Sequence, residues 1–172
     1  MSSAPDRPPH FSGETHDLGV CVLGPVAGDL ETIAARLAGL EPWATMGRSA
    51  ASFVAHMTRP MAATFRFAVR VDDRPVGFLS LRHPFMRGPY IETIALFEEA
   101  QRRGIGRAIV EWIAREAAGE ATNVWLCVTE WNAPARAAYA AMGFVEIGPI
   151  PDVAMLGQTE IFLRRVLGPP AP

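Results

Sequence analysis

The chain has 172 residues, a length that suits one domain with a single core. Its composition, 49% hydrophobic and 20% charged, is typical of a soluble globular protein, and a formal net charge of −2 argues against a general nucleic-acid or membrane-surface binder. All sixteen basic residues are arginine, which excludes a Walker-type phosphate loop because that loop needs a lysine. No apolar run reaches the roughly 20 residues that a membrane span needs.

The ends of the chain differ in composition from its middle. Residues 1–16 are rich in Pro, Ser and His and lack the apolar core of a signal peptide, so they are expected to form a disordered lead-in. Residues 17–168 are expected to form a single domain, followed by a flexible tail over 169–172. Cys21 and Cys127 are interpreted as buried, reduced thiols of a cytoplasmic protein. The four histidines show no ligand spacing, so no metal site is expected.

The first half of the chain alternates between strand and helix patterns. Apolar residues at helical spacing follow Gly28 and Asp29, and the alternating segment TFRFAVRV is joined to its hairpin partner by Asp72 and Asp73. The expected elements are a strand over 17–24, helices over 30–40 and 48–57, and strands over 64–71 and 75–82.

The second half also contains strand and helix patterns, and its helix boundaries are clearer. NVWLCVTE is nearly all apolar, which predicts a central strand buried on both faces. Asn132 is a suitable N-cap for the following helix, Pro134 suits its first turn, and Gly143 ends it. The expected elements are strands over 89–97, 123–130, 144–150 and 158–166, and helices over 105–118 and from 133 to 143. The order β-α-α-β-β-β-α-β-α-β-β predicts an α/β (α+β) domain with a mixed sheet.

The segment QRRGIG, residues 101–106, lies between a strand and a helix and has three interpretations. A dinucleotide fingerprint needs a third small residue where Ile109 stands, and a plain turn would leave three arginines at a helix N-terminus, where cations are disfavoured. The third interpretation is a cradle for a pyrophosphate, because glycines allow close approach and the unpaired amides of a helix start bind anions. This pattern therefore predicts a ligand with clustered phosphates.

The same segment resembles the Q/R-x-x-G-x-G/A signature of the GNAT superfamily of acyl-CoA-dependent N-acetyltransferases. The similarity extends to VWLCVTEWNAPARAAYAAMGFVEIG, with its Asn, its Tyr and its Y-x-x-x-G-F ending, and to the order of elements from about residue 17. The resemblance implies the GNAT fold, a mixed, mostly antiparallel seven-stranded sheet flanked by about four helices. It also implies acetyl-CoA as the cofactor and donor.

The resemblance assigns cofactor contacts to two segments and one helix cap. The backbone of Ile94, Ala95 and Leu96 would pair with pantetheine amides, between strands that splay apart. The pyrophosphate would lie on the loop and helix start, where three arginine side chains could reach it: Gln101, Arg102, Arg103, Gly104, Ile105, Gly106 and Arg107. Asn132 matches a residue that hydrogen-bonds pantetheine, although a helix N-cap alone would also account for it.

The catalytic assignments also come from the resemblance. Tyr139 matches the general acid that protonates the departing thiolate, with ring packing on the sheet as the alternative. An amide at Leu96 or its neighbour would stabilise the oxyanion. By the period of two, Tyr90, Glu92, Ile94 and Leu96 are expected on one face of their strand. Glu92 is the candidate base, acting through water; a structural carboxylate or an ammonium anchor are its alternatives.

The acceptor is not defined by the sequence. By resemblance, residues 40–57 and 148–158 form the acceptor side, and the candidate pocket residues are Glu41, Trp43, Phe85 and Tyr90, with core packing as the alternative for Trp43 and Phe85. The expected partner is a small-molecule or peptide amine, with neither nucleic acid nor membrane. A homodimer is common in the family, and the C-terminal strand IFLRRVL could support one.

One residue departs from a subfamily pattern, and other functions stay open. Cys127 stands where ribosomal-protein N-terminal acetyltransferases of this superfamily carry a glutamate, which argues against that subfamily; an acyl-carrying role for this thiol is the less favoured interpretation. A non-catalytic acyl-CoA-binding module and a transferase of longer acyl groups, or one acting on a hydroxyl, are the alternatives to an N-acetyltransferase.

Overall fold

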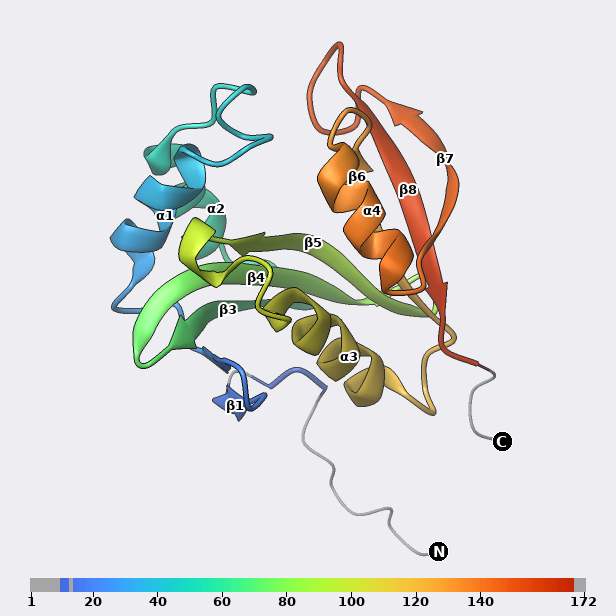
Figure 1. Cartoon of the computed structure of the whole chain (residues 1–172), viewed down its shortest axis with the longest axis horizontal. Helices are drawn as coiled ribbons and strands as arrows, with labels where there is room; N and C mark the ends of the chain where they lie inside the picture. Colours follow the sequence, from blue (N-terminus) through green and yellow to red (C-terminus); the bar gives the residue numbers. More distant parts are fainter. Residues whose placement is uncertain (1–9, 13, 169–172) are drawn as a thin grey trace, which may run out of the picture.

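The computed structural model describes residues 10–12 and 14–168. They form one mixed sheet of eight strands in the order β1-β2-β3-β4-β5-β6-β8-β7, flanked by four α-helices (Figure 1). The elements are β1 His16–Asp17, β2 Val22–Gly24, α1 Leu30–Ala38, α2 Ala50–Thr58, β3 Thr64–Val71, β4 Arg74–Phe85, β5 Gly88–Leu96, the 3-10 helix η1 Glu98–Ala100, α3 Ile105–Ala117, β6 Asn123–Thr129, α4 Ala133–Ala141, β7 Val145–Pro151 and β8 Thr159–Val166.

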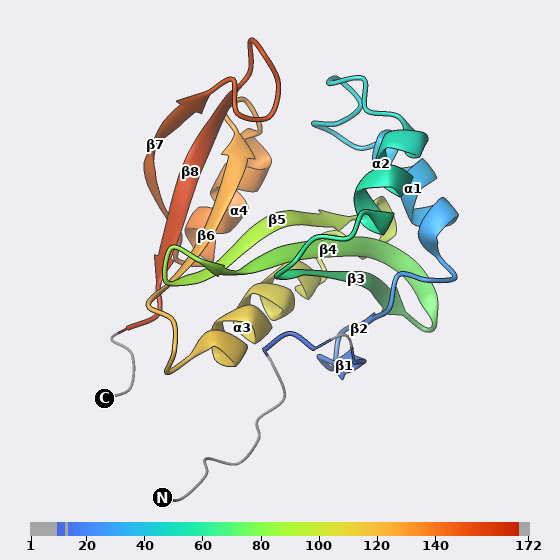
Figure 2. The ribbon, with the colours of Figure 1, turned by 180° about the vertical axis from the view of Figure 1, so that it is seen from behind.

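Helices cover both faces of the sheet. The apolar stripe of α3, including Ile109 and Ile113, is buried against one face with Leu79, Leu81 and other strand residues. On the other face, α1 and α2 pack on a second apolar cluster, which contains Phe78, Ala95 and Phe97. Figures 1 and 2, seen from opposite sides, show α1 and α2 at one end of the molecule and α4 with β7 and β8 at the other.

The expected elements are present, with one strand more than the seven expected. The predicted strand over 17–24 is two short strands, β1 and β2, because the chain turns at Gly19, which has a φ of +80°. The hairpin strand expected over 75–82 continues to Phe85. The remaining helices and strands begin and end within about two residues of the expected positions.

The start of the chain contributes to the core. Residues 1–9 and 13 of the predicted lead-in, and the predicted tail 169–172, lie outside the described residues. Phe11, however, is only 1% exposed and contacts Trp112 edge-on, with ring centroids 5.4 Å apart. The lead-in is therefore not disordered as far as residue 16, because one buried aromatic side chain anchors it to α3.

The final strands are arranged differently from the chain order. β8 lies between β6 and β7 and is antiparallel to both, so its backbone is paired along both edges. The edge strand at this end of the sheet is β7. The segment IFLRRVL therefore cannot extend the sheet into a second copy through its own backbone, and homodimer formation stays a prediction. No helix in the described part of the chain is long and apolar enough to cross a membrane.

Candidate active site

The site begins where two parallel strands separate. β5 and β6 pair only at Tyr90 with Trp125 and at Ile91 with Leu126. Just before this point the strands approach each other so closely that a Cβ on Gly88 would lie 1.8 Å from the carbonyl oxygen of Asn123. Beyond Ile91 the two strands diverge, which opens the sheet between them.

At the same place, a bulge in β5 changes the face of the sheet to which the following side chains point. Ser80 of β4 pairs with Thr93, whereas Leu81 pairs with Ile91, so Glu92 is an extra residue in β5. Ile94 and Leu96 pack with the cluster under α3, while the Glu92 carboxylate bonds to Ser80 on the α1 and α2 side. The expectation that Glu92 shares a face with Ile94 and Leu96 is therefore wrong, because the bulge breaks the period of two.

A cleft of about 610 Å³ occupies the space between the diverging strands. Its walls come from β5, β6, the α1–α2 connection, the start of α3, α4, the β7–β8 loop and β8. The volume lies within the range of small-molecule and cofactor sites. The cleft brings together most of the predicted site residues: Glu41, Trp43, Tyr90, Glu92, Ile94, Ala95, Leu96, Gln101, Arg102, Gly106, Asn132 and Tyr139.

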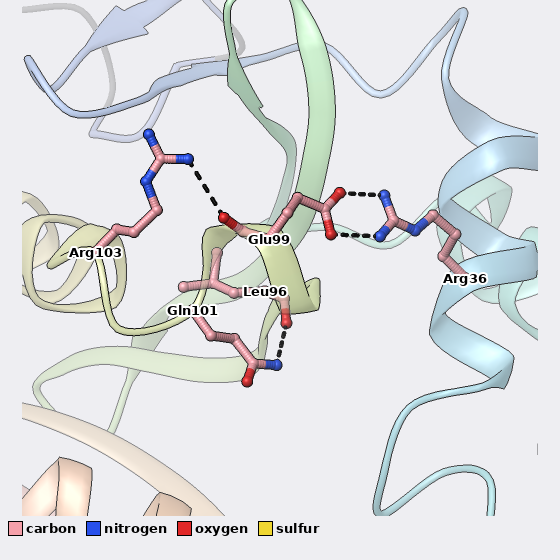
Figure 3. A network of polar contacts seen from close by, with 5 residues as sticks. All are labelled: Arg36, Leu96, Glu99, Gln101 and Arg103. Atoms are coloured by element: carbon pink, nitrogen blue, oxygen red, sulfur yellow. Dashed lines mark hydrogen bonds and ion pairs between the residues drawn. The ribbon is translucent and has the colours of Figure 1, made fainter.

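Other predicted residues lie near the cleft without lining it. Phe85 packs behind Tyr90, with the ring centroids 4.9 Å apart. The Arg103 guanidinium donates to the backbone carbonyl of Glu99 at 3.3 Å (Figure 3), and Arg107 donates to the carbonyl of Ala141, the last residue of α4, at 2.9 Å. Gly104 and Ile105 form the turn into α3. Of the three arginines considered for phosphate contact, only Arg102 lines the cleft.

The loop before α3 has the geometry of an anion cradle. Gly104 is the N-cap of α3 with a φ of +79°, and a Cβ placed on it would meet no atom within 4 Å. The first intrahelical bond joins the Ala108 amide to the Gly104 carbonyl, so the preceding amides at this helix start have no intrahelical acceptor. Such amides, with the helix dipole behind them, favour a bound anion. The loop therefore fits a ligand that carries phosphates.

Side-chain contacts fix this loop to its neighbours. The Gln101 amide donates to the carbonyl of Leu96 at 2.9 Å, which connects the loop to the end of β5 (Figure 3). Arg36 of α1 holds Glu99 through two hydrogen bonds of 2.6 and 2.7 Å and lies 3.8 Å from the ring centre of Phe97. An exposed ion pair contributes little to stability, but its bidentate geometry restricts the orientation of η1.

The carboxylate of Glu92 is held from both sides. Arg82 donates to Oε1 and the Ser80 hydroxyl donates to Oε2, each at 2.7 Å, and the Glu92 side chain is 12% exposed. Both partners come from β4, next to β5, and no pattern in the sequence pointed to either. A carboxylate has about four acceptor positions, so two remain for a water or a ligand.

Tyr139 projects from α4 into the cleft and packs against Phe144, with the ring centroids 5.7 Å apart. Burial raises the pKa of Tyr139 to about 12. The phenol is therefore protonated throughout the neutral range, as a proton donor requires. Ring packing and a position at the cleft are both observed, so the two interpretations of Tyr139 are compatible.

Asn132 also fits both of its interpretations, as a helix cap and as a residue that lines the cleft. Its side-chain oxygen accepts from the amide of Ala135 at 3.2 Å, which makes it the N-cap of α4, and the residue also lines the cleft. The capping interpretation is confirmed, and contact with a cofactor stays a prediction.

Four further residues of the site were not among the predicted ones: Ser80, Arg82, Thr129 and Glu160. Glu160 is 7% exposed, lines the cleft, and accepts at Oε1 from the Thr129 hydroxyl at 2.9 Å. Burial raises its pKa, and the bond from Thr129 opposes that change. An acidic residue in the otherwise apolar start of TEIFLRRV was the signal that could have identified it, as it did for Glu92.

Cys127 is half-buried and faces the same cleft, so it is not the second buried thiol that was expected. Burial, and to a smaller extent the nearby Glu160, raise the pKa of Cys127. A hydrogen bond from Tyr90 lowers this pKa, but by less than burial raises it. The net effect leaves the thiol protonated at neutral pH, which does not favour a nucleophile. No cluster of residues that could hold a metal ion occurs within 10–12 and 14–168.

We therefore predict slow alkylation of Cys127. A Cys21→Ser variant, which leaves only this thiol, should react with iodoacetamide more slowly at neutral pH than a small-molecule thiol does. The rate should rise with pH beyond the usual thiol range, because the raised pKa shifts thiolate formation upward. Fast labelling at neutral pH would contradict this assignment and would favour an acyl-carrying role.

Comparison with known proteins identifies the family. The chain matches the sequence model of the acetyltransferase (GNAT) family over residues 39–144, more than half of its length, and it belongs to this family. Acetyl-CoA is the cofactor that the family uses, and its phosphates fit the cradle before α3. Among curated proteins, none matches the chain significantly.

Solved structures support the fold. Nourseothricin acetyltransferase is 27% identical, with a TM-score of 0.56, and the match covers 62% of this chain and 67% of that one. An acetyltransferase from Thermus thermophilus is 21% identical, with a TM-score of 0.68 and coverage of 88% and 99%. Aminoglycoside 6'-N-acetyltransferase, solved with coenzyme A, is 15% identical, with a TM-score of 0.63 and coverage of 83% and 93%.

Proposed function

We propose that the chain is an N-acetyltransferase that moves an acetyl group from acetyl-CoA to an amine by direct attack. The observation that carries this proposal is the cleft between the diverging ends of β5 and β6, which has an anion cradle at one side and the Tyr139 ring on α4 at another. The bound donor would supply the acetyl group as a thioester. The cleft has a volume of about 610 Å³, within the range of small-molecule and cofactor sites.

Each residue has a defined task in this proposal. The amides at the start of α3, with Arg102, hold the phosphates, and the backbone of Ile94 to Leu96 holds the pantetheine arm. An amide at Leu96 or its neighbour stabilises the negative charge that develops on the carbonyl oxygen. Tyr139 donates its proton to sulfur as the C–S bond breaks and the C–N bond forms. The carbonyl of Leu96 already accepts from Gln101, so the proposal assigns the contact with the ligand to the amide of Leu96.

The amine loses its proton in the same reaction, and Glu92 is the proposed acceptor through a water molecule. Two of its acceptor positions are used by Ser80 and Arg82, and the others can hold this water. Two similar structures are named for different acceptors, nourseothricin and aminoglycosides, so the choice of acceptor depends on the residues of this chain.

Replacing Glu92 tests the base. In an assay with thiol detection, purified protein is first screened with acetyl-CoA against streptothricins, aminoglycosides, polyamines and short peptides. We expect Glu92→Gln to lower kcat/KM for an accepted amine by about 100-fold, a typical contribution of general base catalysis.

Arg82→Gln is the matched control, because it removes the same ion pair but keeps the carboxylate. If Glu92 is the base, Arg82→Gln should retain most of the activity. Equal losses in the two variants would instead assign Glu92 a structural role. Binding of acetyl-CoA without turnover of any amine would favour a non-catalytic acyl-CoA-binding module.

A further inference from the structure

Glu160 is a buried carboxylate without a cation. It lies on β8 directly opposite Thr129 of β6, and the Thr129 hydroxyl donates to Oε1 at 2.9 Å. In the described part of the chain, no arginine or histidine forms an ion pair with it. Carboxylates that are this buried are almost always paired, because an isolated charge loses its hydration without compensation.

The other two carboxylates of the cleft are satisfied by the protein itself. Glu92 pairs with Arg82 and accepts from Ser80. Glu41 is exposed and accepts from both the amide and the hydroxyl of Thr45. Glu160 therefore differs from its neighbours in lacking a cationic partner while it faces a ligand cavity.

The groups around Glu160 do not supply the missing charge. Tyr90 and Cys127 are close enough to sense it electrostatically, and burial raises the pKa of each, so both are neutral at physiological pH. Arg102 is the one basic residue among those that line the cleft in the described chain, and it belongs to the phosphate cradle on the loop before α3. A cation for Glu160 would thus come from a ligand.

Two of the loops that line the cleft contribute mainly apolar residues to it. The α1–α2 connection contributes Trp43 and Met46, and the β7–β8 loop contributes Val153 and Ala154. The Trp43 ring is fixed edge-on against Phe53, with centroids 5.6 Å apart. A ligand that reaches Glu160 therefore meets apolar surface beside its charged end.

We propose that Glu160 binds the ammonium group of the acceptor and that this acceptor is a cationic primary amine with an apolar group next to its amino group. The inference rests on the proposed N-acetyltransferase function, since it assigns the acceptor side of the same cleft. It gives Glu160 the role of positioning the amine, and it leaves proton transfer to Glu92.

The test compares a cation with a neutral molecule of similar shape. Full-length protein is saturated with coenzyme A, which prevents turnover, and titrated with phenethylamine and with 2-phenylethanol by calorimetry. We expect the wild type to bind the amine at least about tenfold more tightly, as a hydrogen bond to a charged group allows. Glu160→Gln keeps an oxygen for Thr129, so it should fold normally, and it should lose this preference.

Two further variants separate the role of Glu160 from general effects. Glu160→Asp keeps the charge on a shorter side chain and should retain a preference for the amine. This variant also tests the inference if Glu160→Gln does not fold. Glu146 is an exposed carboxylate on the edge strand β7, where it pairs with Arg136 of α4. The Glu146→Gln variant should prefer the amine as strongly as the wild type does. Affinity for acetyl-CoA should change less than about twofold in all three variants, as expected for a site separate from the cradle.

Several outcomes would overturn the inference: equal binding of alcohol and amine by the wild type, an unchanged preference in Glu160→Gln, or no binding of either probe. These outcomes are distinct from failure of the proposed function, which would be seen as absence of acetyl-CoA binding to the wild type. In active protein, loss of the ammonium contact should raise KM for the amine more than it lowers kcat, which distinguishes a binding role from that of a base.

Discussion

Replacement of Gly106 by aspartate should abolish acetyl-CoA binding and leave the fold intact. Gly106 lies in the first turn of α3 and lines the cleft, and a Cβ there has only an ordinary contact, 3.7 Å from Leu96 Cδ1. An acidic residue at a helix N-terminus is compatible with the helix dipole, so the variant should fold. Its carboxylate would, however, face the phosphates of the ligand.

The size of this effect follows from Coulomb's law. Two like charges about 4 Å apart at an effective dielectric constant near 20 repel by about 4 kcal/mol. Calorimetry should therefore show a rise in the acetyl-CoA dissociation constant of at least about 100-fold. Gly106→Asn is the matched control, since it adds a side chain of the same size without the charge and should retain most of the affinity. Similar losses of acetyl-CoA affinity in both variants would show that the site needs a glycine at position 106 for lack of space, and not because an anion binds there.

The second large effect is expected for Tyr139→Phe, which removes one oxygen atom from the cleft. The ring would remain packed against Phe144, so the free energy of unfolding should change little. Burial raises the pKa of Tyr139 to about 12, which keeps the phenol protonated at neutral pH and allows it to supply the proton that the thiolate takes. We expect kcat to fall by about 100-fold with an unchanged dissociation constant for acetyl-CoA.

Tyr90→Phe controls for loss of a hydroxyl from the same cleft, because the chain has only these two tyrosines. The Tyr90 hydroxyl lies close enough to Cys127 to lower the pKa of its thiol, and its loss should affect kcat less than the loss of the Tyr139 hydroxyl. Steady-state kinetics on both variants, with acetyl-CoA binding measured separately, distinguish the two. An unchanged kcat in Tyr139→Phe would mean that water or another group protonates the thiolate.

Local patterns predicted most of the fold. The period of 3.6 in α3, the cap at Asn132, and the alternation in β3 are features of neighbouring residues, and the elements they indicate are present. The cradle could also be predicted, because glycine spacing and helix position are both encoded in one short segment. The family resemblance added the role of Tyr139, which no local pattern indicates.

The features that escaped prediction depend on contacts between distant segments. The bulge at Glu92 arises from pairing with β4, and the alternation of β5 alone gives no sign of it. The partners of Glu92 and Glu160 lie on neighbouring strands, so their different environments follow only from the register. The burial of Phe11 likewise depends on its packing against Trp112, about a hundred residues away along the chain.

Titration of the purified protein with acetyl-CoA tests the central claim most directly, with NAD and ATP as controls in the same calorimeter. Selective binding of acetyl-CoA, lost in Gly106→Asp, is the result we predict from the cradle and the cleft between β5 and β6. Absence of binding, or tighter binding of NAD, would contradict the assignment of the loop before α3, and the roles proposed for Tyr139, Glu92 and Glu160 would fall with it.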